Sequence, residues 1–204
     1  MKIRWSIRRR WIAALAVLLC GTGAIAFVGT RPAAEEEVAV SWEEAKLRGR
    51  IDISERRLYV EENGEVIGSY AVAVGTSKHP TPRGSFTMRR IIWNPRWVPP
   101  NVAWAKGKKA REPGDPANPM GKVKIFFKEP DYYVHGTNAP ETVGSAASHG
   151  CVRMRNADVI EFATLLMEHG GAPVEAGFVQ RMINRVRSTR EVRLSNPIPL
   201  RVTS

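Results

Sequence analysis

Two side chains with nucleophilic and acid–base chemistry lie sixteen residues apart in the second half of this chain. Cys151 stands within residues 148–153, whose sequence is Ser-His-Gly-Cys-Val-Arg, and His135 follows Tyr-Tyr-Val at 132–134. A thiol without a disulfide partner is either a packing residue or a reactive group. An imidazole that takes the thiol proton would make the sulfur a nucleophile for acyl transfer. Two interpretations stay open here: a catalytic Cys–His pair, or a buried cysteine and an unrelated histidine.

Three features around Cys151 favour reactivity. Gly150 permits a tight turn that exposes the neighbouring side chain and its amide. Arg153, and His149 when protonated, would favour the thiolate through their positive charge. The segment also precedes a helix predicted to begin at Asn156, where the positive end of the helix dipole would act in the same direction. For His135, a position at a strand end next to Gly136 lets one ring nitrogen enter a cleft while a backbone carbonyl holds the other.

The elements that position these residues are mainly strands. Alternating apolar residues predict strands at 51–60, 70–74, 86–93, 123–127, 132–135, 192–194 and 200–202. Asn63-Gly64 predicts a type I′ hairpin turn. Helical periodicity appears only late: one helix from an Asn156 N-cap to a stop at 170–171, and one over 179–186. The fold class expected is therefore mainly β with attached helices (α+β).

A proline-rich stretch, residues 94–121, separates two of these strands. It holds Trp97 and Trp104, and Trp93 stands just before it. Long loops in compact domains are often lids or binding walls. The tryptophans therefore either line a groove for peptide or glycan, or pack beneath the loop.

Several segments in order resemble the L,D-transpeptidase (YkuD-type) family. Residues 135–137 (His-Gly-Thr) and 148–154 (Ser-His-Gly-Cys-Val-Arg-Met) are similar to its active-site signature. Upstream, residues 74–75 and 81–86 resemble the family's turn before its central strands, and residues 118–121 its loop before the histidine strand. The resemblance covers roughly residues 49–170.

That resemblance implies a β-sandwich-like catalytic domain that acts on peptidoglycan stem peptides without metal or organic cofactor. Cys151 would attack the L-centre carbonyl at position three of a tetrapeptide stem and release D-alanine. An amine would resolve the thioester, either from a second stem, giving a 3→3 cross-link, or from a lysine of a wall-anchored protein. Water as acceptor is the alternative, which would make the chain an L,D-carboxypeptidase or related wall hydrolase.

The roles implied for the site residues follow this chemistry. His135 is the general base and acid, and the Gly136 carbonyl orients its ring. The amides of Gly150 and Cys151, with His149, would hold the oxyanion. The remaining candidates are a supporting turn residue, Ser148, and two substrate-binding residues, Arg153 and Thr137. For three of them a plainer role stays open: Arg153 pairing with Asp158, Ser148 bonding locally, and His149 supporting the site without touching substrate.

Other function classes are less consistent with the chain. A zinc site from His135, His149 and Cys151 would lack the usual C-x-x-C or H-E-x-x-H spacing. A non-enzymatic wall-binding module would need no thiol. A nucleic-acid partner is disfavoured because six of the 31 Lys and Arg residues precede Pro32, where no acid occurs, which leaves residues 32–204 with a net charge of only +5.

The N-terminus predicts export. Five basic residues up to Arg10 precede a run of 18 residues, 11–28, without a charged side chain. We expect residues 1–31 to be a membrane anchor, with a cleaved signal as the alternative. Residues 32–48 form an acidic linker with a short helix started by the capping-box spacing of 41–44. The catalytic domain, 49–204, would then work in the cell envelope, outside the cytoplasmic membrane.

Overall fold

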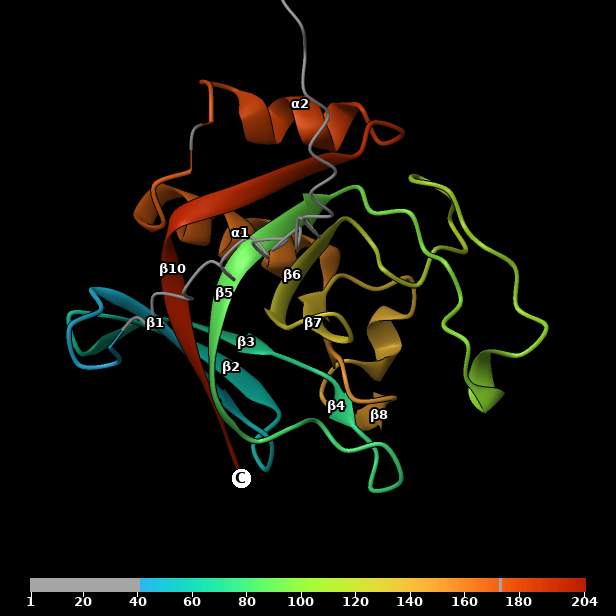
Figure 1. Cartoon of the computed structure of the whole chain (residues 1–204), viewed down its shortest axis with the longest axis horizontal. Helices are drawn as coiled ribbons and strands as arrows, with labels where there is room; N and C mark the ends of the chain where they lie inside the picture. Colours follow the sequence, from blue (N-terminus) through green and yellow to red (C-terminus); the bar gives the residue numbers. More distant parts are fainter. Residues whose placement is uncertain (1–40, 173) are drawn as a thin grey trace, which may run out of the picture. The chain divides into compact units, whose positions relative to one another are not determined.

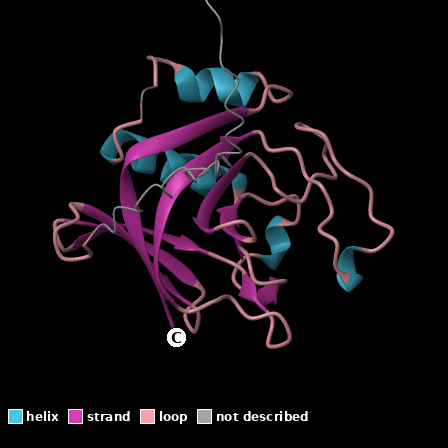
Figure 2. Cartoon of the chain, viewed as in Figure 1, coloured by secondary structure: helices cyan, strands magenta, loops and turns pink. Residues whose placement is uncertain are grey.

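The computed structural model describes residues 41–172 and 174–204. Its strands are Leu47–Asp52 (β1), Arg57–Glu62 (β2), Glu65–Ala71 (β3), Val74–Gly75 (β4), Gly84–Trp93 (β5), Val123–Lys128 (β6), Tyr132–His135 (β7), Ala146–Ser148 (β8), Val152–Arg153 (β9) and Arg190–Thr203 (β10). Its helices are Asn156–His169 (α1) and Phe178–Asn184 (α2), with two 3-10 turns at Ala103–Ala105 (η1) and Pro140–Thr142 (η2). The expectation of a mainly β domain with attached helices is confirmed (Figure 2).

Eight strands form one sheet in the order β3-β2-β1-β10-β5-β6-β7-β9, and β4 pairs with β8 in a second, two-stranded sheet. Figure 1 shows the large sheet strongly bent, with α1 behind it and α2 across one end of β10. The layering expected of a sandwich therefore comes from one curved sheet rather than from two large separate ones. β7 and β9 end this sheet as a parallel pair.

The core lies between the sheet and α1. Val159, Phe162 and Leu166 of α1 are fully buried, as the helical periodicity predicted. The Trp93 side chain, at the end of β5, packs edge-to-face on Phe178 of α2, with ring centroids 5.7 Å apart. These core contacts hold β5 and β6 on one face of the sheet. Polar residues can therefore stand at the far end of the sheet.

The first predicted strand is in fact two. A turn separates β1 from β2, because the Asp52 carboxylate accepts hydrogen bonds from the Ser54 hydroxyl and the Glu55 N–H, and Arg56 adopts φ 54°. The next turn is as predicted: Asn63 and Gly64 have φ 49° and 92°.

At the C-terminal end the two predicted strands are one, β10. Its register against β5 shifts between Arg193 and Ile198, so the proline segment is accommodated as an irregularity within the strand. The prediction of two separate strands was wrong because a bulge spares the prolines from ladder hydrogen bonds.

Both helices were predicted, with small errors at their ends. Asn156 is the first residue of α1 and not its cap, since its side chain bonds the Lys122 N–H and the Thr137 carbonyl. Gly170 ends α1 as expected. α2 ends at Asn184, before Val186. Residues 42–44 form a turn where a short helix was expected.

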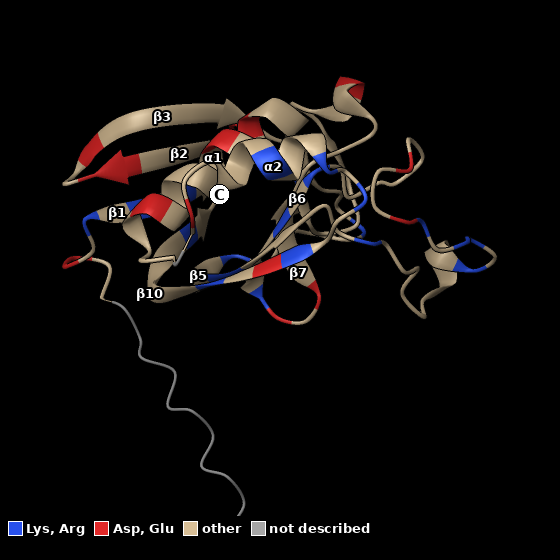
Figure 3. Cartoon of the chain, turned by 90° about the horizontal axis from the view of Figure 1, so that it is seen from above, with Lys and Arg blue, Asp and Glu red and all other residues tan. Residues whose placement is uncertain are grey.

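Positive and negative charges are interspersed over the domain. Figure 3 shows acidic segments at the β2–β3 end and basic segments on α2.

The anchor expected at residues 11–28 lies outside the described residues. Within residues 41–172 and 174–204, neither helix has the length and apolarity needed to cross a bilayer.

Candidate active site

Three neighbouring strands bring five polar side chains to one face of the sheet. His135 on β7 lies beside Arg153 on β9 and, on its other side, beside Lys124 on β6. Side chains alternate along a strand, so Tyr133, two positions before His135 on β7, shares that face. Cys151, immediately before β9 and two positions before Arg153, lines the same cavity. The residues between them are fully buried in the core. Strand alternation therefore places the thiol diagonally from the imidazole.

These side chains line a cavity of about 500 Å³. The sheet supplies its floor, and residues 94–121, the loop that Figure 1 shows projecting beside the sheet, supply its wall. The wall residues include Trp97, Val98, Pro100, Val102, Trp104, Lys108, Pro119 and Met120. Trp97 and Trp104 therefore line the groove, whereas Trp93 packs in the core.

The His135 ring is held in one orientation. Its side chain is 3% exposed, and Nδ1 lies 2.6 Å from the Gly136 carbonyl oxygen, which can only accept. Nδ1 therefore carries the proton, and Nε2 is left as the basic nitrogen. Burial lowers the pKa of His135 to about 3, helped by the nearby Arg153 charge and opposed by the Gly136 carbonyl. The imidazole is neutral at pH 7 and can accept a proton.

The Cys151 thiol is partly buried and points to a carbonyl. Its Sγ donates to the Asp131 carbonyl oxygen at 3.3 Å, and no hydrogen bond joins it to His135 in the described part of the chain. Burial raises the pKa of Cys151; hydrogen bonds from Tyr133 and the charges of Lys124 and Arg153 oppose that rise. Our expectation of a favoured thiolate is thus wrong for this state, because desolvation outweighs the nearby cations.

Ser148 and Gly150 shape the turn that carries Cys151. The Ser148 hydroxyl donates to the Cys151 carbonyl and accepts from the Gly150 N–H at 3.1 Å. Gly150 has φ 110°, and a Cβ there would lie 2.9 Å from the Tyr132 ring. Ser148 is therefore a local turn residue, the plainer of its two roles. The Gly150 N–H is engaged, whereas the hydrogen bonds within residues 41–172 and 174–204 include none from the Cys151 N–H.

His149 lies on the rim of the cavity. Its ring stacks on Trp104 with centroids 4.2 Å apart and an interplanar angle of 19°, and it meets His79 at 4.9 Å. Partial burial, with the nearby His79 and Arg153, lowers the pKa of His149. The stack joins the loop to the Cys151 turn. The exposed His79 also belongs to this cluster.

Gly136 and Thr137 are part of the scaffold behind the cavity. A Cβ on Gly136 would lie 2.2 Å from the Asn156 side-chain oxygen, so only glycine fits there. Thr137 is 3% exposed, and its hydroxyl accepts the Ala139 N–H at 3.0 Å. Thr137 does not line the cavity, in contrast to its expected contact with substrate.

Arg153 lines the cavity and has no ion-pair partner among residues 41–172 and 174–204. Its alternative pairing with Asp158 is therefore not formed. The zinc alternative also lacks its geometry, because His135, His149 and Cys151 do not form a metal-ligating group in the described residues. His135, His149 and Cys151 instead contact three different groups: the Gly136 carbonyl, the Trp104 ring and the Asp131 carbonyl.

Two residues of this face, Tyr133 and Lys124, were not predicted from the sequence. The Lys124 Nζ lies 3.8 Å from the centre of the Tyr133 ring, and burial lowers the pKa of Lys124 to about 8. Both had a usable signal. Tyr133 stands two residues before His135 in a strand, and Lys124 is a charge within the apolar run of β6.

Comparisons with known proteins agree with this arrangement. Residues 48–175 match the sequence profile of the YkuD family, described as the L,D-transpeptidase catalytic domain. The chain is 32% identical over 116 residues to the YkuD protein of Bacillus licheniformis, named as a candidate L,D-transpeptidase; the match covers 57% of this chain and 58% of that protein. It is 32% identical over 117 residues to the ErfK/SrfK protein of Escherichia coli, named as a probable L,D-transpeptidase, covering 53% and 37%. The matches thus span less than two thirds of these relatives.

Among solved structures, L,D-transpeptidase 3 from Mycobacterium tuberculosis, in complex with a faropenem-derived adduct, superposes with a TM-score of 0.50 at 15% identity, over 78% of this chain and 60% of that one. This likeness supports the fold alone. The sequence profile covers more than half of the chain and includes both His135 and Cys151. The chain therefore belongs to the L,D-transpeptidase catalytic domain (YkuD) family.

Proposed function

We propose that this protein is a peptidoglycan L,D-transpeptidase that uses Cys151 as its nucleophile. The observation that carries the proposal is the shared cavity of Cys151 and His135, with the neutral imidazole fixed through Nδ1 by the Gly136 carbonyl. A neutral thiol and a neutral imidazole in one cavity are competent for base catalysis, because the imidazole can accept the thiol proton as the sulfur attacks.

The reaction begins with a rotation of the Cys151 side chain. The thiol leaves the Asp131 carbonyl, and its proton passes to Nε2 of His135. The sulfur attacks the carbonyl carbon of the L-centre at position three, and the peptide bond to D-alanine breaks as the imidazolium protonates the leaving amine. An acceptor amine then attacks the thioester and gives its proton to His135. The C–S bond breaks, and the imidazolium returns that proton to the departing sulfur.

The developing oxyanion needs donors that do not serve another bond. Within the described part of the chain the Cys151 N–H meets that requirement, whereas the Gly150 N–H is bonded to the Ser148 hydroxyl. The long loop supports this step indirectly. Its apolar residues Trp97, Val98 and Val102 line the cavity, and substrate bound against them would shield the thioester from water, which favours an amine acceptor over hydrolysis.

We also propose the domain organisation that the N-terminus predicts. Residues 1–31 would export and anchor the chain, residues 32–48 would be the linker, and the domain from residue 49 would face the wall of the cell envelope. Protease treatment of intact spheroplasts tests this arrangement. Digestion of the domain from outside supports it, and complete protection would contradict it.

Product analysis tests the reaction. The full chain is incubated with tetrapeptide-stem muropeptides, with and without an added acceptor amine, and the products are resolved by mass. A cross-linked dimer with released D-alanine is expected, while a tripeptide alone would indicate the carboxypeptidase. Acceptor-dependent products from a lysine-containing peptide would point to protein anchoring. No change in any substrate would refute the proposal.

A further inference from the structure

Two cations of the cavity floor have no anionic partner. Lys124 and Arg153 flank His135 on the two neighbouring strands, and both line the cavity. Neither side chain has a carboxylate oxygen within 4.0 Å in the described ranges. Lys124 meets only ring faces, at 3.8 Å for Tyr133 and 4.4 Å for Phe126.

Partly buried, unpaired charges are costly to the folded protein. Burial lowers the pKa of Lys124 and that of Arg153, which shows that each charge is desolvated. A ring face offsets only part of the lost hydration of an ammonium group. Such charges are usually paired, or meet a ligand that pairs them. The one acidic side chain of the cavity lining, Asp131, is exposed and does not pair with either cation.

Lys124 and Arg153 are positioned to contact substrate groups that lie close to the scissile bond. Arg153 lies two residues beyond Cys151, a distance of about 7 Å along a strand. Lys124 reaches the same cavity from β6, across the strand that carries His135. An anion held between them would sit within one residue of the carbonyl that Cys151 attacks.

We propose that Lys124 and Arg153 together form a carboxylate receptor, which selects stem peptides carrying a free carboxylate next to the scissile bond over stems carrying a carboxamide there. The inference rests on the proposed function and adds its substrate class. Two carboxylates of a stem have this chemistry: the terminal carboxylate of the leaving D-residue and the side-chain carboxylate of the diamino acid at position three.

Binding to the full-length Cys151→Ala variant tests the receptor without turnover. Three synthetic tetrapeptides are titrated calorimetrically: the free acid, the C-terminal amide, and the side-chain amide. We expect one amide to bind at least about tenfold more weakly than the acid, and the weaker one identifies the carboxylate that is recognised. Equal affinities for all three, or no binding of any, would overturn the proposal.

Substitutions assign the preference to the two residues. Lys124→Met and Arg153→Gln are made in the Cys151→Ala background. Each should reduce the difference in affinity between the acid and the amide peptides, mainly by weakening the binding of the acid peptide. Lys124→Arg should keep the preference. Lys128→Met is the matched control, since Lys128 lies on the same strand and over a ring, 5.6 Å from the centre of Tyr132, but outside the cavity. A preference that persists in Lys124→Met and Arg153→Gln would mean that the receptor lies elsewhere.

The proposed function can fail separately. Intact mass measurement of the wild-type chain shows whether any of the three peptides acylates Cys151. Acylation with no acid preference in binding would sink the receptor and leave the transpeptidase standing. A clear acid preference without acylation would support the receptor and count against the enzyme.

Discussion

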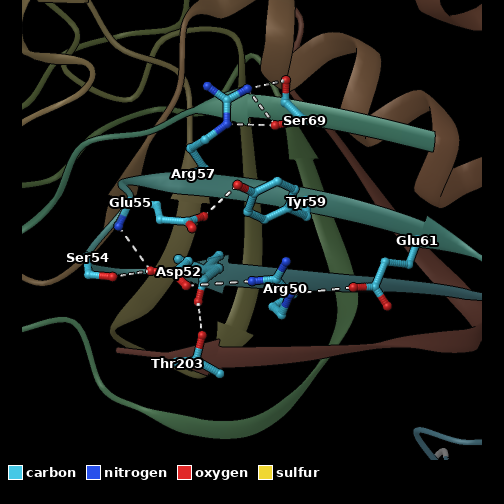
Figure 4. A network of polar contacts seen from close by, with 10 residues as sticks. Arg50, Asp52, Ser54, Glu55, Arg57, Tyr59, Glu61, Ser69 and Thr203 are labelled. Carbon is cyan, nitrogen blue, oxygen red and sulfur yellow. Dashed lines mark hydrogen bonds and ion pairs between the residues drawn. The ribbon is translucent and has the colours of Figure 1, made fainter. Parts of the chain in front are cut away.

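Cations at the two ends of the large sheet differ in whether a carboxylate pairs with them. On β1 and β2, Arg48 and Arg50 both pair with Glu61, at 3.0 and 3.5 Å, and Figure 4 shows Arg50 and Glu61 among the polar contacts of these strands. On β6 and β9, Lys124 and Arg153 face a cavity, and neither is in an ion pair with another described residue. Both pairs of cations stand on strands of one sheet, so secondary structure does not account for the contrast.

This contrast separates charges that stabilise the fold from charges that are available to bind a ligand. At the paired end Arg48 and Arg50 each have a carboxylate oxygen within 3.5 Å, and neither lines the cavity. At the unpaired end burial shifts the pKa of each titratable neighbour: those of His135 and Lys124 fall and that of Cys151 rises. Clusters of perturbed groups in a cavity are typical of functional sites.

The largest expected effect is from His135→Gln, which removes the base and keeps a side chain of similar size. Transpeptidation should fall by about 10²–10⁴-fold, the range for a general base. Muropeptide product rates measure it. His169→Gln, the same change near the end of α1, is the control and should leave the rate unaltered. A loss of less than about tenfold in His135→Gln would contradict the assigned role.

Tyr133→Phe should have a smaller effect. Removing the hydroxyl removes a donor that lowers the pKa of Cys151, so that pKa should rise further. We expect the pH midpoint of iodoacetamide alkylation to shift upward and the acylation rate at pH 7 to drop about tenfold. Tyr132→Phe, one residue away, controls for general loosening of β7. An unchanged alkylation profile would show that Tyr133 does not contact the reactive sulfur.

Acid should destabilise the folded protein through His135. Its pKa is about 3 when folded and ordinary when unfolded, so between roughly pH 6.5 and 3 only the unfolded chain binds the proton. Stability is thus fully present above this window and falls by up to about 1.4 kcal/mol per pH unit within it. Urea unfolding at pH 7, 6 and 5 measures the loss. In His135→Gln this part of the pH dependence should vanish; an identical dependence in the variant would place the titration elsewhere.

The smallest effect is expected at the paired end of the sheet. Glu61→Gln breaks the pairs with Arg48 and Arg50, both partly exposed, and should cost about 1 kcal/mol or less of unfolding free energy. Activity should not change, because none of these residues lines the cavity. Chemical denaturation and product rates measure the two. A large loss of activity without a loss of stability would remove the contrast between the two ends.

Much of the fold could be predicted from local pattern, and the errors have local causes. Period-two alternation found β5, β6 and β7, and Asn63-Gly64 marked its turn. The first strand was wrongly joined because Arg56 takes a left-handed conformation that its residue type does not signal. β10 was wrongly divided because a bulge let prolines stay within a strand.

Cys151 and His135 were predicted from the sequence, but the neighbouring site residues Tyr133 and Lys124 were not. Tyr133 and Lys124 join the site only through the register of β6, β7 and β9, which pairs residues distant in sequence. Thr137 was assigned to substrate from its position beside the histidine, yet its hydroxyl bonds to the Ala139 N–H. The direction of the pKa shift at Cys151 was also missed, because burial cannot be read from neighbouring charges.

The most direct test is the covalent state of Cys151 itself. The full chain is mixed with a free-acid tetrapeptide stem, quenched in acid, and measured by intact mass and peptide mapping. The account predicts a thioester adduct on Cys151 equal to the stem less its terminal D-alanine, absent from Cys151→Ala. Product formation that continues in Cys151→Ala, or an adduct on another residue, would contradict it.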